Sequence, residues 1–204
     1  MFNPNLKEER KLWKKGFKRV AGLDEAGRGP LSGPVVAGAV LIKTKRFSFF
    51  SIKDSKKLSA KKREEFFKIL TNHPDLEWGI GIVSEKVIDK INILEATKLA
   101  MKKAIKKLKK KPDFLILDGN FRINLPFPQK SIIKADEKVF SCAAASIIAK
   151  VTRDRIMDRY HKKYPLYKFN KHKGYPTKLH FKLLKKHGPC KIHRKSFKPV
   201  RLAK

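Results

Sequence analysis

Acidic residues stand directly after three short apolar runs of the kind that predict buried strands. Asp24 and Glu25 follow the first run, Asp118 follows the second and Asp136 follows the third. A carboxylate at the end of a buried strand is unfavourable unless something pairs with it, so three such strands indicate that the acids meet in one site. Oxygen ligands of this kind suit Mg²⁺ or Mn²⁺, and a bound cation would let phosphate approach. The sequence therefore predicts a divalent-metal site.

Each acid taken alone also has an ordinary structural explanation. Asp118 opens the string Asp118-Gly119-Asn120, which is typical of a turn. Asp136 precedes a predicted helix, where a carboxylate can accept hydrogen bonds from the first backbone amides. The metal site is thus favoured by the set of acids rather than by any single one.

A glycine-rich string, Gly27-Arg28-Gly29-Pro30, follows the first two acids, and Gly33-Pro34 lies close behind it. Glycines let the backbone approach a ligand closely, and exposed amides beside a guanidinium would hold a phosphate or a sugar hydroxyl. A tight turn between two strands would explain the same string. The glycine spacing is not that of a dinucleotide-binding fingerprint, and the absence of Gly-Lys-Ser/Thr argues against a P-loop nucleotidase.

The elements that must position these residues are predicted to be a mixture of strands and helices. Apolar runs between turn residues predict strands, and apolar residues at helical spacing with lysines around the other face predict helices. The predicted strands are 20–23, 35–42, 78–83, 114–117 and 131–134, and the predicted helices are 59–70, 91–108 and about 138–160. Ser59 is the expected N-cap of the first helix, and Lys111-Pro112 is expected to end the second.

Basic residues dominate the composition. The chain of 204 residues carries 51 Lys or Arg against 18 Asp or Glu, which gives a formal net charge of +33. Such an excess predicts a polyanionic partner, most simply the phosphates of a nucleic acid. Hydrophobic residues make up 41% of the chain, including 14 Phe, which is too much for a disordered basic tail.

The charge is unevenly distributed along the chain. Residues 161–204 contain 15 Lys or Arg and no Asp or Glu, together with five of the six His. All four Tyr lie between positions 160 and 175, so rings that can stack on bases or sugars are interleaved with cations. A solvated C-terminal helix would explain the charge alone, but the aromatic residues favour a nucleic-acid surface.

Several classes of protein and site are disfavoured. The longest apolar run, 35–42, is far too short to span a membrane, and the charged N-terminus lacks the apolar core of a signal peptide, so we expect a cytoplasmic protein. Cys142 and Cys190 cannot make a disulfide framework or a four-thiolate zinc site. The spacing His187-x-x-Cys190-x-x-His193 lacks a fourth zinc ligand, so we expect a solvated loop there.

Five strings of the sequence stand in the order found in one enzyme family. They are Gly22-Leu-Asp24-Glu25-Ala-Gly27-Arg28-Gly29-Pro30, Asp54-Ser55-Lys56-Lys57-Leu58-Ser59, Asp118-Gly119-Asn120, Ala143-Ala-Ala-Ser146-Ile-Ile-Ala-Lys150-Val-Thr-Arg-Asp154 and His172-Lys173-Gly174-Tyr175-Pro176-Thr177. Together they resemble bacterial ribonuclease HII, and the resemblance runs from about residue 19 to residue 200.

The resemblance implies a ribonuclease H-like fold, with a mixed five-stranded sheet flanked by helices and a helical basic C-terminal extension. It also implies hydrolysis of RNA in RNA/DNA hybrids and at ribonucleotides embedded in duplex DNA, by two-metal-ion catalysis that leaves 5′-phosphate and 3′-hydroxyl ends. The catalytic and metal-binding residues would be Asp24, Glu25, Asp118 and Asp136, with Mn²⁺ or Mg²⁺ as the cofactor. The substrate-binding residues would be Gly27, Arg28 and Gly29 at the ribose 2′-OH, Lys56 and Lys57 at phosphates, and Tyr175 at the RNA-to-DNA junction.

We expect an N-terminal extension over 1–16, a catalytic domain over 17–160 and a basic substrate-binding segment over 161–204, in a monomer that binds hybrids and ribonucleotide-containing DNA. A non-catalytic RNA-binding or ribosomal protein is the alternative that the charge alone would favour. Another nuclease or a transposase of the same fold is a second alternative. Such enzymes are not expected to carry the Gly-Arg-Gly loop that this sequence contains. The acids discriminate, because carboxylates beside such a loop repel phosphate unless a metal is present.

Overall fold

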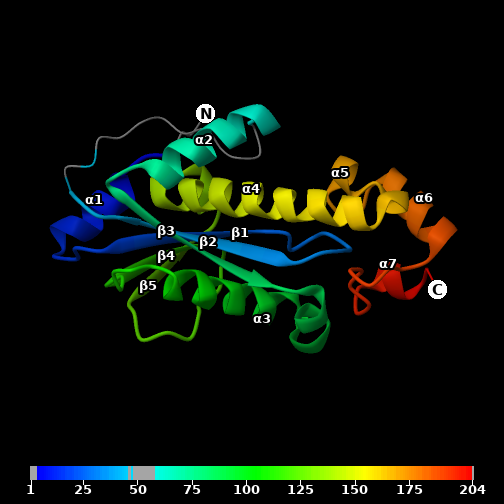
Figure 1. The fold of residues 1–204 in the computed structure, drawn as a ribbon. Coiled ribbons are helices and arrows are strands. Elements are labelled where there is room, and N and C mark those ends of the chain that lie inside the picture. The colour runs from blue at the N-terminus through cyan, green and yellow to red at the C-terminus, as the bar shows by residue number, and fades with distance from the viewer. Residues whose placement is uncertain (1–3, 46, 48–57, 204) are drawn as a thin grey trace.

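A computed structural model of the chain describes residues 4–45, 47 and 58–203. They form three layers, in which a sheet lies between α4 and α2 on one face and α3 on the other (Figure 1). The elements are α1 (Lys7–Lys14), β1 (Val20–Ala26), β2 (Val35–Ile42), α2 (Ala60–Asn72), β3 (Leu76–Val83), α3 (Glu85–Lys106), β4 (Phe114–Asp118), β5 (Gln129–Ile132), the 3₁₀ helix η1 (Ala135–Glu137), α4 (Phe140–Lys163), the 3₁₀ helix η2 (Pro165–Tyr167), α5 (Phe169–His172), α6 (Lys178–His187) and α7 (Lys198–Arg201).

The sheet has five strands in the order β3-β2-β1-β4-β5. The pairs β1–β2 and β2–β3 are antiparallel, whereas β1–β4 and β4–β5 are parallel. The predicted mixed five-stranded sheet flanked by helices is therefore confirmed. Since β1 and β4 are parallel neighbours, their carboxyl ends meet at the same edge of the sheet.

Strand boundaries agree with the predictions where a strand is buried throughout and differ where pairing decides them. The strand β2 spans Val35–Ile42 as predicted, and all its residues are buried. The prediction that Asp24 and Glu25 follow the first strand was wrong, because β1 continues to Ala26. The reason is its antiparallel partner, since β2 pairs with β1 as far as Ala26. Similarly, β5 is Gln129–Ile132 rather than 131–134, because it runs in register with β4.

The helix α3 consists of two parts separated by Asn92, whose φ of 64° is not helical. The Asn92 side chain accepts hydrogen bonds from the backbone amides of Leu94 (2.9 Å) and Glu95 (3.1 Å), which caps the second part. The prediction of a helix from residue 91 thus found the second part and missed the first, which begins at Glu85.

The helix α4 lies directly on β1 and β2 and forms the centre of one core. The predicted small-residue patch is fully buried, with Ala143, Ala144 and Ala145 all 0% exposed. A Cβ atom at Gly38 would lie 2.4 Å from the Ala145 carbonyl oxygen, so only glycine allows this approach. Because Gly38 is paired with Asp24, the close contact brings the second turn of α4 over the end of β1 that carries the acids.

The helix α1 joins the same core and supports the start of α4. Leu12 and Trp13 are buried in that core, and the Glu9 side chain is 0% exposed. The Glu9 carboxylate accepts a hydrogen bond of 2.9 Å from the backbone N–H of Ser141 in the first turn of α4. A carboxylate at this position complements the helix dipole, although burial raises the pKa of Glu9.

The short helices α5, α6 and α7 lie around the C-terminal end of α4 (Figure 1). Backbone pairing joins this part of the chain to the loop after β1, with an antiparallel bridge between Ser32 and His193. Among the described residues, no helix is both long enough and apolar enough to cross a membrane.

Candidate active site

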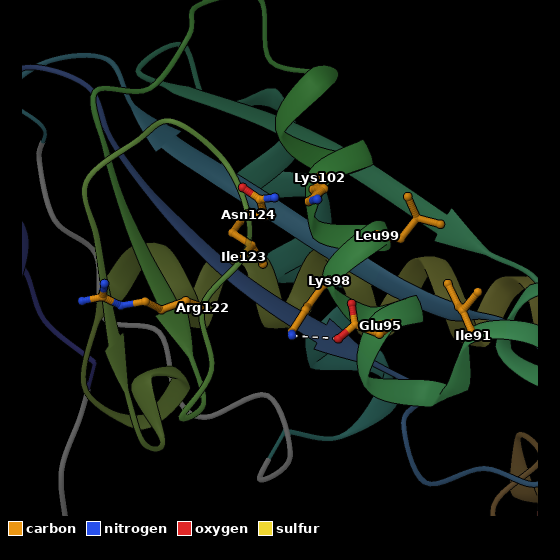
Figure 2. A pocket seen from close by; sticks show the side chains of 8 residues that line it. All are labelled: Ile91, Glu95, Lys98, Leu99, Lys102, Arg122, Ile123 and Asn124. Atoms are coloured by element: carbon orange, nitrogen blue, oxygen red, sulfur yellow. Dashed lines mark hydrogen bonds and ion pairs between the residues drawn. The ribbon is translucent and has the colours of Figure 1, made fainter.

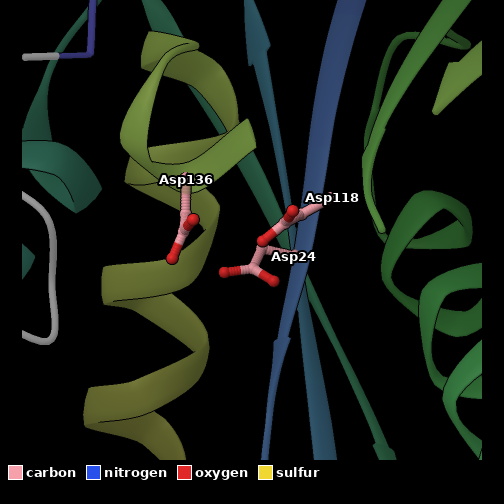
Figure 3. Close-up of side chains that lie close together, drawn as sticks. All are labelled: Asp24, Asp118 and Asp136. Atoms are coloured by element: carbon pink, nitrogen blue, oxygen red, sulfur yellow. The ribbon is translucent and has the colours of Figure 1, made fainter. Parts of the chain in front are cut away.

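Three aspartates from three separate segments come together at one edge of the sheet. Leu23 of β1 is paired with Leu117 of β4, so the next residues, Asp24 and Asp118, lie side by side. Asp136 comes from η1, the short turn between β5 and α4. Each of the three aspartates has a carboxylate oxygen within 4.8 Å of one from each of the others, and all three point toward one another in Figure 3.

Hydrogen bonds from backbone amides fix two of the three aspartates in this arrangement. Asp118 Oδ1 accepts from the Ala135 N–H at 2.9 Å, which ties η1 to the end of β4. Asp24 Oδ1 accepts from the Glu25 N–H at 2.7 Å. Backbone amides therefore hold the carboxylates of Asp24 and Asp118 in place.

The electrostatics of Asp24 indicate a site made for a cation. Asp24 is 5% exposed and Asp136 is 1% exposed. Burial raises the pKa of Asp24 well above its usual value, and the negative charges of Glu25, Asp118 and Asp136 raise it further. Carboxylate oxygens gathered in a buried site match the ligands that Mg²⁺ and Mn²⁺ prefer. The residues present thus fit a divalent metal.

Glu25 lies beside this group but outside it. Its Oε1 accepts a hydrogen bond of 3.3 Å from Arg28 Nη1, in the glycine-rich loop. Both residues line a pocket of about 270 Å³. The lining residues are Asp24, Glu25, Ala26, Gly27, Arg28, Gly29, Asp118, Ser146, Lys150 and Tyr175. Three of the four predicted acids, the Gly-Arg-Gly loop and the tyrosine therefore share one cavity, although they come from three different strings of the sequence.

The prediction missed two residues of α4 that face this pocket. Ser146 hydrogen-bonds the Asp24 side chain, which partly offsets the rise in its pKa. Lys150 lies one turn further on, with its Nζ 2.8 Å from Asp154 Oδ1 and 5.2 Å from the centre of the Tyr175 ring. The spacing of four residues between Ser146, Lys150 and Asp154 places them on one helix face, which is the signal that could have found them.

Two predicted phosphate contacts, Lys56 and Lys57, lie outside the described residues. The predicted solvated loop at His187-x-x-Cys190-x-x-His193 was wrong in part. His187 is exposed, but Cys190 is half-buried and His193 is 1% exposed. His193 is buried because it packs against the rings of Tyr167 and Phe169.

A larger pocket, of about 590 Å³, lies between α3 and the loop around residues 122–124 (Figure 2). It is lined by Ile91, Glu95, Lys98, Leu99, Lys102, Arg122, Ile123 and Asn124. Its single carboxylate, Glu95, is paired with Lys98 at 2.8 Å. This pocket therefore lacks the grouped oxygen ligands of the smaller one.

Comparisons with known proteins agree over nearly the whole chain. A family model described as Ribonuclease HII matches residues 21–200. The ribonuclease HII of Endomicrobium trichonymphae is 51% identical over 201 residues, which are 98% of this chain and 95% of that protein. That of Chlamydia caviae is 53% identical over 195 residues, which are 95% of this chain and 90% of that protein.

A solved structure shows the same fold. The crystal structure of ribonuclease H2 from Pyrococcus horikoshii OT3 superposes with a TM-score of 0.72 at 32% sequence identity, over 91% of this chain and 96% of that chain. The family match, the sequence identities and the fold all indicate a ribonuclease H enzyme, and the acidic site fits the metal that such an enzyme needs. The chain therefore belongs to the ribonuclease HII family, and it is a metal-dependent endoribonuclease of the ribonuclease H class, which acts on RNA/DNA hybrids.

Proposed function

We propose that this enzyme cleaves both the RNA strand of hybrids and single ribonucleotides embedded in duplex DNA, by two-metal-ion catalysis that leaves 5′-phosphate and 3′-hydroxyl ends. The observation that carries the proposal is the shared pocket, in which Asp24 and Asp118 stand beside the loop of Gly27, Arg28 and Gly29. The residues proposed to catalyse hydrolysis and those proposed to recognise a single ribose thus line the same pocket.

Asp24, Asp118 and Asp136 would hold the metal ions, with Glu25 as a further ligand. Bound Mg²⁺ or Mn²⁺ supplies an activated water and stabilises charge on the leaving 3′ oxygen. The chain's own contribution is to keep the carboxylates in fixed positions, through the backbone hydrogen bonds to Asp24 and Asp118. Burial of Asp24 and Asp136 also excludes water from one side of the site.

The neighbouring residues would select the substrate. The 2′-OH is both a donor and an acceptor, and it is what distinguishes RNA from DNA at a given position. The backbone of Gly27, Arg28 and Gly29 offers amides to this hydroxyl, and the Arg28 guanidinium offers charge to the adjacent phosphate. The Tyr175 ring would stack on the deoxyribose that follows the ribonucleotide, and Lys56 and Lys57 would bind phosphates.

Family membership sets aside the non-catalytic RNA-binding alternative. The acids give the physical reason, because the carboxylates that line the pocket would repel a nucleic acid that was only bound there. The excess of Lys and Arg then serves to hold the substrate over a negatively charged centre that a metal must neutralise.

A cleavage assay tests the proposal directly. The substrates are a continuous RNA/DNA hybrid, a DNA duplex with one ribonucleotide and an all-DNA duplex, each with Mg²⁺, with Mn²⁺ and with a chelator. We expect both ribose-containing substrates to be cut in the presence of either metal, the all-DNA duplex to stay intact, and the chelator to abolish cleavage. Cleavage of the hybrid alone would overturn the proposed action on embedded ribonucleotides.

A further inference from the structure

Arg194, between α6 and α7, is 0% exposed although it lies in the most basic part of the chain. All three of its nitrogen groups donate to backbone carbonyls of the loop after β1. Nε donates to Gly33 (3.0 Å), Nη1 to Arg28 (2.9 Å) and Nη2 to Gly27 (2.6 Å). Only a planar guanidinium has donors arranged to reach three acceptors in this way, since a lysine ammonium is a single point charge.

These hydrogen bonds determine which way the backbone amides of the loop point. In a trans peptide the C=O and the following N–H point in opposite directions. Because Arg194 binds the carbonyls of Gly27 and Arg28, the N–H groups of Arg28 and Gly29 point away from it. Gly27, Arg28 and Gly29 line the pocket that holds the acids, whereas Arg194 is not part of its lining. Arg194 therefore lies behind the loop.

The loop is also confined from a second side. Gly27 has a φ of +98°, and a Cβ atom there would lie 2.1 Å from Nε of Arg153, another buried arginine. The segment that carries Arg194 is itself anchored to α3, because Asp89 accepts hydrogen bonds from the amides of Lys195 and Ser196, each at 2.9 Å. Arg194 is thus a fixed support for the loop.

The preceding residue, His193, reaches the other substrate-reading element. Its Nδ1 accepts from the Cys190 N–H at 3.0 Å, so its proton lies on Nε2. His193 Nε2 is 3.1 Å from His180 Nε2, and His180 Nδ1 is 2.9 Å from the Tyr175 carbonyl oxygen. A single set of neutral tautomers satisfies the whole chain of hydrogen bonds. Burial lowers the pKa of both histidines to about 4, which keeps them neutral near pH 7.

We infer that His193 and Arg194 are positioning residues for ribose recognition, which hold Tyr175 and the loop of Gly27, Arg28 and Gly29 from behind. The inference rests on the proposed reading of the 2′-OH and of the junction by those elements. Adjacent residues of one segment orient both, so their relative placement is set in the C-terminal part of the chain. A misplacement of about 1 Å at a reacting centre can lower a rate about 100-fold.

Arg194→Lys tests the first half of the inference, because lysine keeps the positive charge but lacks the three nitrogens that donate to the loop. We expect kcat/KM on the single-ribonucleotide duplex to fall by about 100-fold, with Kd for an all-DNA duplex changed less than about threefold. The matched control is Ile192→Ala. Ile192 is 3% exposed in the same segment, and its side chain packs against Met157, Tyr167 and Phe169, so its truncation destabilises the segment. Its backbone carbonyl, which accepts a hydrogen bond of 2.8 Å from the Gly33 N–H, is unchanged in this variant.

All variants are assayed at a temperature at which each is folded, as judged by circular dichroism. Ile192→Ala should then keep kcat/KM within about threefold of the wild-type value. An equal loss in Ile192→Ala and Arg194→Lys would show that Arg194 acts only through stability and would overturn the inference. Wild-type kcat/KM in Arg194→Lys would do the same.

His193→Gln tests the second half independently, and it carries the whole test should Arg194→Lys not fold. If His193 acts through Tyr175, the double variant with Tyr175→Ala should be no worse than Tyr175→Ala alone. Additive losses in this double-mutant cycle would contradict the positioning role, because a general structural defect would add to the loss of the ring.

Hydrogen exchange provides a readout that needs no catalysis. The backbone amides of residues 27–29 and 31–33 should exchange at least about tenfold faster in Arg194→Lys than in the wild type, and those of β3 should not change. Unchanged exchange at these amides would overturn the inference. If the wild type failed to cut an embedded ribonucleotide, the proposed function would fail, while the exchange result would still decide whether Arg194 orders the loop.

Discussion

The protein buries charge in two places, and the two places treat it in opposite ways. At the sheet edge, Asp24, Asp118 and Asp136 face one another, and the negative charges around Asp24 raise its pKa. Behind the pocket, the guanidinium groups of Arg153 and Arg194 each donate three hydrogen bonds to backbone carbonyls. The acidic cluster needs a bound cation to offset its repulsion, whereas backbone carbonyls of the same chain accept the hydrogen bonds of the two arginines.

The comparison indicates how the fold divides its tasks. Like charges held together without a counter-ion destabilise the metal-free protein and so provide affinity for a cation. Burial and the neighbouring Arg153 lower the pKa of Arg194 to about 9, which leaves it charged near neutral pH. Each of its three nitrogens makes a hydrogen bond, which gives the buried guanidinium the rigidity that a support for the loop of Gly27, Arg28 and Gly29 requires.

The largest effect is expected at the acidic cluster. Asp118→Asn removes one carboxylate charge and should lower the rate of hybrid cleavage by about 1000-fold, since bound metals contribute several kcal/mol to such reactions. Binding of the hybrid, measured by fluorescence anisotropy, should stay largely intact because the basic surface is unchanged. Asp113→Asn, just before the start of the same strand, is the control and should leave turnover unchanged. A wild-type rate of cleavage in Asp118→Asn would contradict the assignment of Asp118 as a metal ligand.

A smaller loss of activity, selective for one of the two substrates, is expected at Tyr175, which the histidines support. Tyr175→Ala should lower kcat/KM on a single-ribonucleotide duplex by about 10- to 100-fold, the usual worth of one stacked ring, and should affect a continuous hybrid less. Tyr175→Phe keeps the ring and should keep most of the activity. Equal losses on both substrates would count against junction reading by this residue.

The histidine cluster should make stability fall in acid. His180 and His193 have pKa values lowered from 6.5 to about 4, so between these pH values the unfolded chain binds more protons than the folded one. The free energy of unfolding should therefore drop by about 3 kcal/mol for each histidine as the pH falls through this window. The groups that face the two rings include His172, Tyr167 and Phe169, and none of these is acidic.

Urea unfolding from pH 7 to pH 4 measures this slope. His193→Gln and His180→Gln should each flatten it relative to the wild type, whatever their stability at pH 7. Carboxylates elsewhere titrate in all the proteins alike, so the difference between the slopes isolates the histidines. Identical slopes in the wild type and both variants would refute the assignment of neutral, buried rings.

The smallest effect should have the opposite sign from most core substitutions. Asp24→Asn keeps an oxygen to accept the Glu25 amide and removes a buried negative charge. In a chelator, this variant should be more stable than the wild type by about 1 kcal/mol, or roughly 2–4 °C in thermal midpoint. Added Mg²⁺ should raise the midpoint of the wild type and not of the variant. A variant less stable than the metal-free wild type would contradict the repulsion at the cluster.

Much of the fold and of the site could be predicted because local chemistry determined it. The strand β2 is buried throughout and bounded by turn residues, so its apolar run gave its limits. The end of β1 could not be predicted, since pairing with β2 carries the strand through two charged residues. Ser146 and Lys150 were missed because their relevance depends on which face of α4 meets the sheet.

The clearest division lies between the acids and the C-terminal basic residues. The sequence by itself determined the acidic residues, the glycine-rich loop and the family, because each follows from residue types at fixed local spacing. Only the tertiary structure decided that Arg194 and His193 are buried supports rather than parts of an exposed basic surface. The physical reason is that burial of a basic side chain depends on acceptors supplied from elsewhere in the chain. The Gly27 carbonyl that Arg194 binds lies 167 residues away in sequence.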